Sequence, residues 1–145
     1  MICLGIAIKK NEIWYSVING SSMEDSVLSE TGKQSFQTDN TTGVLMMNFS
    51  NIFTELITKY HPDIIVYKLS LNVDMKQIPY MHFSLGVLNL LCAQNNISIN
   101  ERSSQWITAG KKAKIIKCEN HFSDKSFKNG EEMQATLIAW FEIGQ

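Results

Sequence analysis

The sequence has few of the features that usually indicate binding to a charged partner or insertion into a membrane. Its formal net charge is −1, so no overall field of either sign points to nucleic acid or to an acidic partner. No apolar run approaches the roughly 20 residues that cross a bilayer, and no signal peptide is evident at the start. These absences predict a soluble, cytoplasmic protein.

Cysteine is also scarce. Cys3, Cys92 and Cys118 lie far apart, and no CxxC spacing indicates a zinc or redox site. Cys3 and Cys92 lie in apolar runs, so we expect both thiols to be buried and the thiol of Cys118 to lie near the surface. This usage is typical of a reducing compartment.

The motifs of several catalytic classes are missing. No serine lies in a GxSxG elbow, and no glycine-rich loop precedes a helix in the form that cradles phosphate. The three histidines lack metal-ligand spacing such as HxxxH, and we expect structural or surface roles for them: His61, His82 and His121.

What the sequence does contain is enough apolar material for one core. A chain of 145 residues with 44% hydrophobic content predicts a single domain over residues 1–145. Cys3–Ile8 is apolar at every position, which is typical of a central strand covered on both faces. A turn at Lys10-Asn11 leads to a second strand, Glu12–Asn19. Residues 23–30 are polar and irregular, and Lys33–Thr38 is the predicted third strand, at an edge.

The rest of the chain alternates helices and strands. Asp39–Thr42 holds helix N-cap residues, and apolar positions at three- and four-residue steps predict a helix that ends at His61-Pro62. Asp63–Tyr67 then predicts a buried strand parallel to the first, and Met81–Asn95 a well-buried helix. The elements expected after this helix are, in order, a strand at Ile97–Glu101, a short helix from Ser103-Ser104 to Gly110, a basic run at Lys111–Lys117, a polar segment at Cys118–Gly130 and a final helix at Glu131–Phe141.

This order predicts an α/β fold: a mixed five-stranded sheet, with three antiparallel strands first and two parallel strands after them, and helices on both faces. It resembles the ribonuclease H-like fold, and its details are most similar to the RuvC-type Holliday-junction resolvase branch. The segments that carry the resemblance are Cys3–Ala7 for the family's I-L-G-I-D strand, Ile64–Lys68 for a strand ending in a catalytic Glu, Ser103–Lys114 for a helix and glycine turn, and Glu131–Ala139 for the closing D-x-x-D-A-L-A-x-A helix. The chain also resembles an uncharacterised bacterial family of similar size, in which the strand corresponding to Ile64–Lys68 likewise ends in Lys.

The resemblance implies phosphodiester hydrolysis by two Mg²⁺ ions that carboxylates hold. The corresponding positions here are Ala7, Lys68 (or Tyr67), Glu131 and Gln134, so one carboxylate in four survives. This departure predicts a degenerate site without a metal. The Lys68 ammonium would take the place of the metal's charge and pair with Glu131 or Glu132, or else it would extend to solvent at the strand end.

Two other sets of residues are candidates. A nuclease with displaced carboxylates would draw on Glu12, Asp63, Asp74, Glu101, Glu131 and Glu132, of which Glu101 lies nearest the expected crevice and Glu12 and Asp63 lie away from it. Phosphate contacts would come from Lys9, Lys10, Trp106, Lys111, Lys112, Lys114 and Lys117, whose alternative role is a solvated helix face. Exposed aromatic rings such as Trp14, Tyr80 or Trp140 would instead mark a protein interface.

The sequence therefore predicts a non-catalytic binding or adaptor module without a cofactor, acting on a protein partner or weakly on nucleic acid. The first alternative is a divergent nuclease of the resolvase type, which would need Mg²⁺. The second is a self-associating protein, a homodimer whose interface uses the last two helices.

Overall fold

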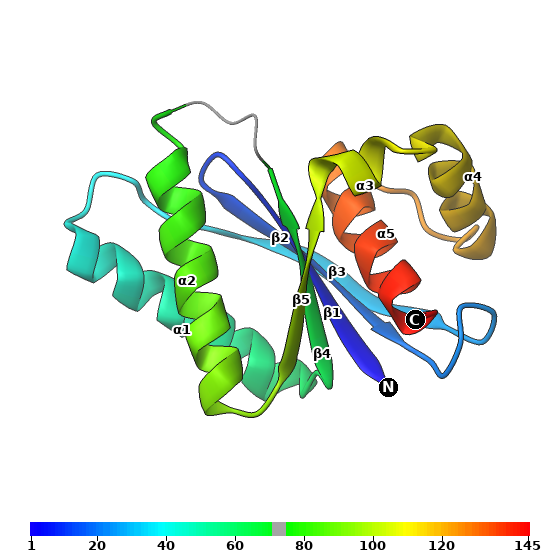
Figure 1. Ribbon diagram of the computed structural model, residues 1–145, viewed down its shortest axis with the longest axis horizontal. Coiled ribbons are helices and arrows are strands. Elements are labelled where there is room, and N and C mark those ends of the chain that lie inside the picture. Colours follow the sequence, from blue (N-terminus) through cyan, green and yellow to red (C-terminus); the bar gives the residue numbers. More distant parts are fainter. Residues whose placement is uncertain (71–74) are drawn as a thin grey trace.

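Five strands form a single sheet in the order β3-β2-β1-β4-β5 (Figure 1). The computed structural model describes residues 1–70 and 75–145. The strands are β1 (Ile2–Lys9), β2 (Glu12–Asn19), β3 (Val27–Ser35), β4 (Ile64–Leu69) and β5 (Ser98–Ser103). The β1–β2 and β2–β3 pairs are antiparallel, whereas β1–β4 and β4–β5 are parallel. The expected mixed sheet is therefore confirmed.

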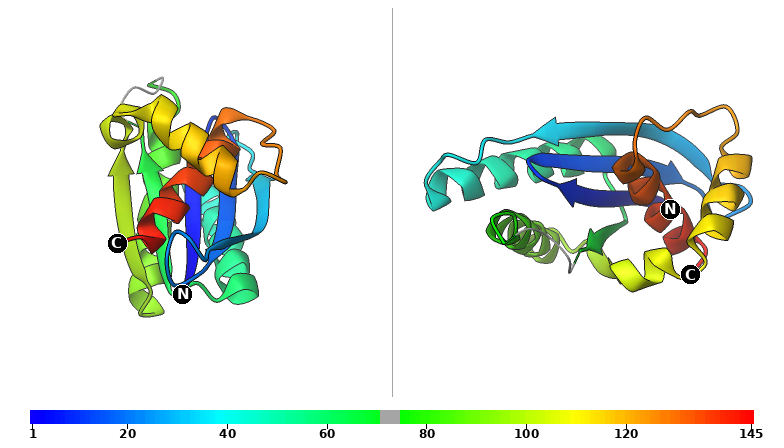
Figure 2. Two further views of the ribbon diagram at one scale, coloured as in Figure 1. Left: turned by 90° about the vertical axis from the view of Figure 1, so that its right-hand side faces the viewer. Right: turned by 90° about the horizontal axis from the view of Figure 1, so that it is seen from above.

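Helices cover both faces of this sheet. One face packs against α1 (Thr42–Tyr60) and α2 (Ile78–Gln94), and the other against α5 (Gly130–Ile143). The two smaller helices, α3 (Ser104–Thr108) and α4 (Lys111–His121), flank α5 (Figures 1 and 2). None of the helices in the described ranges has the length and apolar content to cross a membrane.

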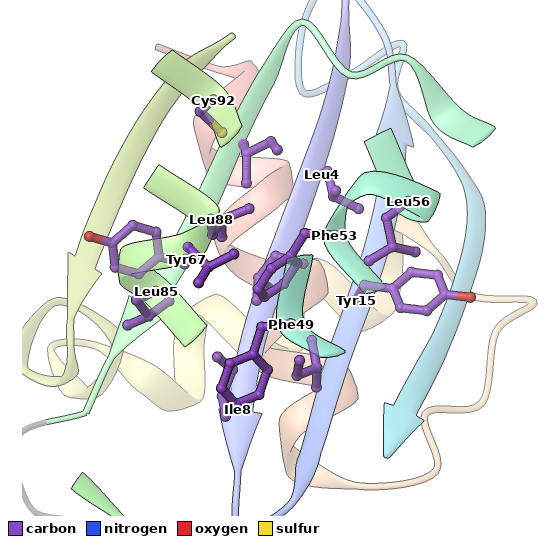
Figure 3. Close-up of a cluster of buried hydrophobic side chains, with 14 of the residues drawn as sticks. Leu4, Ile8, Tyr15, Phe49, Phe53, Leu56, Tyr67, Leu85, Leu88 and Cys92 are labelled. Carbon is purple, nitrogen blue, oxygen red and sulfur yellow. The ribbon is translucent and has the colours of Figure 1, made fainter. Parts of the chain in front are cut away.

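The side chains of β1 point alternately to the two faces of the sheet, and the core is therefore divided into two layers. Leu4, Ile6 and Ile8 point to the larger apolar cluster beneath α1 and α2, where Phe49 and Phe53 are fully buried (Figure 3). The opposite face of β1 carries Cys3, Gly5 and Ala7 and lies under α5. Small side chains on this face let α5 approach the strand closely, and that approach positions the start of α5 at the end of β1.

The third strand begins six residues and ends three residues earlier than the sequence predicts, at Val27–Ser35 and not at Lys33–Thr38. Its pairing with β2 contains a bulge, because Val17 is opposite Glu30 and Ile18 is opposite Leu28. Ser29 is therefore the extra residue on β3. This edge strand is polar and partly exposed, so it lacks the alternation that predicts a strand.

The basic run forms the start of a helix that continues to His121, so part of the segment expected to be irregular after Cys118 is helical. Cys118 itself is fully buried, and the expectation of a thiol near the surface was wrong. The physical reason is that α4 packs against α5 through Cys118 and Phe122. Burial raises the pKa of the Cys118 thiol to about 12 and that of the Cys92 thiol to about 11.

Candidate functional site

The carboxyl ends of β1 and β4 bring three of the four predicted site positions together. These strands pair in parallel as far as Ile6 and Tyr67, so the next residues, Ala7 and Lys68, are neighbours. Ala7 packs against Ala135 of α5, and Glu131 lies one helical turn before Ala135. The start of α5 therefore stands over the ends of both strands.

Lys68 and Glu131 form an ion pair at this point. The Lys68 Nζ lies 3.6 Å from Glu131 Oε2, and the two side chains are only 14% and 10% exposed. The predicted pairing of Lys68 with a glutamate of the last helix is confirmed, and Lys68 does not extend freely into solvent. Glu131 Oε2 accepts no hydrogen bond from any described residue, so charge attraction to Lys68 is its main stabilisation.

The sequence at the start of α5 explains why a carboxylate is tolerated there. Asn129 is the N-cap, and its Oδ1 accepts a hydrogen bond of 2.9 Å from the Glu132 backbone N–H. Glu131 and Glu132 lie in the first turn, where the helix dipole favours negative charge. The cap and the dipole fix the position of Glu131 and help to offset its burial.

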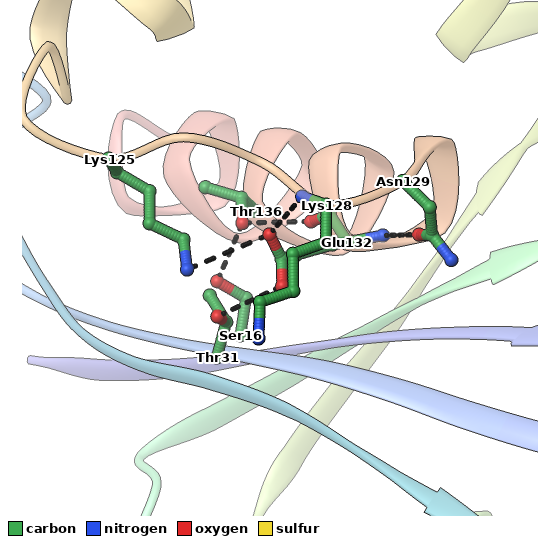
Figure 4. Close-up of polar contacts among 7 residues, drawn as sticks. All are labelled: Ser16, Thr31, Lys125, Lys128, Asn129, Glu132 and Thr136. Atoms are coloured by element: carbon green, nitrogen blue, oxygen red, sulfur yellow. Dashed lines mark hydrogen bonds and ion pairs between the residues drawn. The ribbon is translucent and has the colours of Figure 1, made fainter.

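The side chain of Glu132 lies against Thr31 of β3 (Figure 4). Its carboxylate accepts hydrogen bonds from the Thr31 hydroxyl and the Lys128 backbone N–H, and Lys125 Nζ lies 3.7 Å away. Behind it, Thr136 contacts Ser16 with their hydroxyl oxygens 2.8 Å apart. Glu132 thus fastens the segment before α5 to the sheet, and Glu131 alone faces Lys68.

The other two predicted site positions offer no charge. Ala7 is fully buried between Trp14 and Ala135. Gln134 lies one turn after Glu131 on α5, and its Oε1 is buried without a hydrogen-bond partner among the described residues. The four positions therefore provide a methyl group, an ammonium, one carboxylate and one amide.

This set does not fit Mg²⁺. The ion prefers several carboxylate oxygens in octahedral geometry, and here the one carboxylate already faces an ammonium. Across residues 1–70 and 75–145, no group of three or more His, Cys, Asp or Glu side chains is arranged to hold a metal.

The displaced carboxylates do not converge either. Glu101 accepts a 2.9 Å hydrogen bond from the Tyr67 hydroxyl, and Asp63 accepts one of 2.7 Å from the Ile2 backbone N–H at the other end of β1. Glu12 forms an ion pair of 2.8 Å with Lys33. The expectation that Glu12 lies away from the site was wrong, because it borders the same cavity as Glu131. Asp74 lies outside the described residues.

Lysines from two distant segments flank the ion pair. Lys9 and Lys10 border a cavity with Glu131 and Trp14 on one side. On the other side, Lys111 borders a second cavity, which Lys68 also lines. Lys10 reaches this place because it adopts a left-handed backbone conformation (φ 55°) in the β1–β2 turn. The hydroxyl residues of the second cavity, Ser70, Ser104 and Thr108, were missed; the only sequence signal was the pair of cap residues at Ser103-Ser104.

The remaining basic candidates lie elsewhere on α4. Lys114 Nζ sits 3.9 Å from the centre of the Trp106 ring and donates a 2.5 Å hydrogen bond to the Trp106 carbonyl. Arg102 lies 5.3 Å from the same ring, so the protein's own cations occupy the surroundings of Trp106. Lys112 and Lys117 are exposed, and Lys117 lies 5.9 Å from the Trp140 ring.

The comparison with known proteins identifies the fold. The structure of Thermus thermophilus RuvC superimposes with a TM-score of 0.78 at 10% sequence identity, covering 97% of this chain and 92% of that one. T. thermophilus RuvC in complex with a Holliday junction substrate gives 0.78 at 10%, covering 97% and 90%. The yeast mitochondrial Holliday junction resolvase Ydc2 gives 0.73 at 12%, covering 98% and 77%.

These similarities show that the chain has the ribonuclease H-like fold of RuvC-type structures. No family model matches the chain, and no curated protein is significantly similar to it in sequence. The likeness to an uncharacterised bacterial family therefore stays a prediction.

Proposed function

We propose that this protein is a non-catalytic ribonuclease H-fold module that binds the phosphate backbone of nucleic acid across the carboxyl ends of β1 and β4. The observation that carries the proposal is the buried Lys68–Glu131 pair with Lys9 and Lys10 on one side and Lys111 on the other. A structural neighbour is described in complex with a Holliday junction, which makes branched DNA the first ligand to test. Cytoplasmic location remains a prediction from the sequence.

The charge distribution favours binding without chemistry. Three lysines from two distant segments lie on either side of a site whose own carboxylate is matched by an ammonium, so the surface is locally basic although the chain is nearly neutral. Three or four phosphate contacts give weak binding that depends strongly on salt. With the metal ligands reduced to one paired carboxylate, these residues have no means to activate water through Mg²⁺.

The direct test is a titration of a labelled four-way junction and a linear duplex of the same sequence across a salt series. We expect weak binding that falls steeply as salt rises, and about tenfold weaker binding for Lys10→Glu. The matched control is Lys59→Glu, which makes the same charge change on α1, on the other face of the sheet. No binding at low salt, or an equal loss for both variants, would overturn the proposal.

A divergent nuclease is the alternative function. We expect no cleavage of the junction in Mg²⁺ or Mn²⁺, because Glu101 and Asp63 are held elsewhere and the two carboxylates that border one cavity, Glu12 and Glu131, are each paired with a lysine. Cleavage that disappears in Glu131→Gln would contradict the non-catalytic proposal and favour the nuclease.

Self-association is a second candidate function, and the surface that favours it lies on α2 and not on the last two helices that the sequence suggested. The predicted dimer face includes α5, but α5 is almost entirely buried against the sheet. In contrast, α2 contains no Asp, Glu, Lys or Arg, and it exposes Phe83, Gly86 and Leu90 along one stripe. We propose this stripe as the contact. Light scattering should report a dimer for the wild type and a monomer for Leu90→Asp; a wild-type monomer at high concentration would exclude it.

A further inference from the structure

A small cavity of about 190 Å³ lies beside Lys68, on the side of α3 and α4. Its polar lining consists of Lys68, Ser70, Ser104, Thr108, Lys111 and Gln134. The cavity is smaller than the sites that hold drug-sized ligands. It suits a single small polar group.

The charges around this cavity select an anion. Two ammonium groups, Lys68 and Lys111, border it, and no acidic side chain of residues 1–70 and 75–145 does. Lys111 has no ion-pair partner in the described part of the chain, and it begins α4, whose first backbone N–H groups have no acceptor within the helix. Among the described residues, the carboxylates of Glu131 and Glu12 border a separate cavity on the other side of the pair.

The Lys68–Glu131 contact itself is incomplete. The atoms are 3.6 Å apart, which is beyond hydrogen-bond distance, and Glu131 Oε2 has no other described partner although the residue is 92% buried (8% exposed). Gln134 Oε1, one turn further along α5, is also buried without a partner. A lysine held by one long contact can turn to a better acceptor when the attraction gained there exceeds the attraction to Glu131 that is lost.

We infer that this cavity binds one phosphate group and that Glu131 competes with the phosphate for Lys68. In the free protein Lys68 faces Glu131, and in the bound protein its ammonium turns to the phosphate, which Lys111 also contacts. Glu131 then retains the favourable field at the start of α5. The inference rests on the proposed function and adds its regulation: the protein's own carboxylate lowers its affinity for phosphate.

The test is a titration of the folded protein with inorganic phosphate, in which the NMR chemical shifts of the backbone amides report binding. Removing the competing charge in Glu131→Gln should tighten binding about tenfold, because the carboxylate that attracts Lys68 is then absent from a poorly solvated place. Lys111→Gln should weaken binding by a similar factor. The matched control Glu55→Gln removes an exposed carboxylate on α1 and should leave the affinity unchanged.

The outcomes separate this inference from the proposed function. If Glu131→Gln binds phosphate no more tightly than Glu55→Gln, the competition is excluded. If phosphate does not bind but the junction still does, the cavity is excluded and the proposed function stands. If phosphate binds as described and the junction does not, the proposed function fails and the cavity stands.

The source of the phosphate is settled with a short single strand prepared with and without a 5′-phosphate. Tighter binding of the phosphorylated strand would assign the cavity to terminal phosphates, and equal binding would assign it to phosphodiesters. If Lys68→Gln is added both to the wild type and to Glu131→Gln, the two resulting proteins should bind phosphate with equal affinity. Persistence of the full difference in the double variant would show that Glu131 acts through another group.

Discussion

Gly5 and Ala135 pack so closely that a Cβ on Gly5 would stand 2.1 Å from the Ala135 carbonyl oxygen. This contact sets how near α5 comes to β1, and therefore how near Glu131 comes to Lys68. The geometry of the candidate site thus depends on a strand position that has no side chain. The distance also excludes any larger residue, because backbone and not a flexible side chain is in the way.

Gly5→Ala should lower the free energy of unfolding by about 3 kcal/mol or more, since α5 must move away from β1. Urea denaturation measures the change. The matched control is Gly43→Ala on α1, where an added Cβ meets nothing within 4 Å. That variant should gain about 0.5–1 kcal/mol from helix propensity. Equal stability of both variants would contradict the close packing.

Lys68→Ala should destabilise the protein by about 2 kcal/mol, because Glu131 would be left buried without an opposite charge. Mg²⁺ should not change the melting temperature of the wild type, since Lys68 already supplies the positive charge. Thermal melts in EDTA and in Mg²⁺ check both statements. A clear rise in the wild-type melting temperature with Mg²⁺ would refute the replacement of metal by lysine.

Asn129→Ala should cost about 1 kcal/mol through loss of the N-cap of α5. Asn129→Asp should retain most of the stability, because a carboxylate accepts the same hydrogen bond and suits the dipole. Denaturant midpoints of the two variants provide the comparison. A large loss in the aspartate variant would show that charge repulsion from Glu131 and Glu132 outweighs the cap.

Stability should fall as the pH rises above about 8.5, where thiols of the unfolded chain begin to ionise. Burial raises the pKa of Cys3, Cys92 and Cys118, so the folded protein keeps these protons while the unfolded chain loses them. The unfolded state then binds fewer protons, and each thiol lowers the free energy of unfolding by about 1.4 kcal/mol per pH unit. The effect is absent below about pH 8 and persists up to the folded pKa, about 11 for Cys92.

Denaturation across alkaline pH measures this dependence, and Cys118→Ala should make it shallower. An unchanged slope in that variant would show that Cys118 ionises equally well in the folded state. At neutral pH all three native thiols should resist a thiol reagent, as they are fully buried.

Strong periodicity in the sequence was sufficient to predict most of the architecture. The continuous apolar run of β1 and the three- and four-residue steps of α1 correspond to elements at nearly the predicted bounds. The edge strand β3 was misplaced because its residues alternate neither in polarity nor in burial. The helix α4 was underestimated because four lysines near its start hide the few apolar residues that pack.

The candidate site was predictable as far as it depends on where its residues lie along β1, β4 and α5. The resemblance to the RuvC-type branch placed Lys68 and Glu131 in one site, and their pairing follows from opposite charges where the end of β4 meets the start of α5. The sequence did not predict which glutamate would pair. That choice depends on Asn129 and Thr31, whose contacts fix Glu132 on the other side of the helix. The contact of Glu132 with Thr31 joins residues 101 positions apart and leaves no local pattern.

The pairing of Ser16 with Thr136, 120 residues later, has a consequence during synthesis. Until residues 130–143 leave the ribosome, the face of β1 and β2 that α5 covers is exposed, and the sheet can form only half of its core. Contacts of such long range slow folding, and partly covered sheets are prone to associate. We therefore expect the nascent chain to depend on chaperones until its final helix is made.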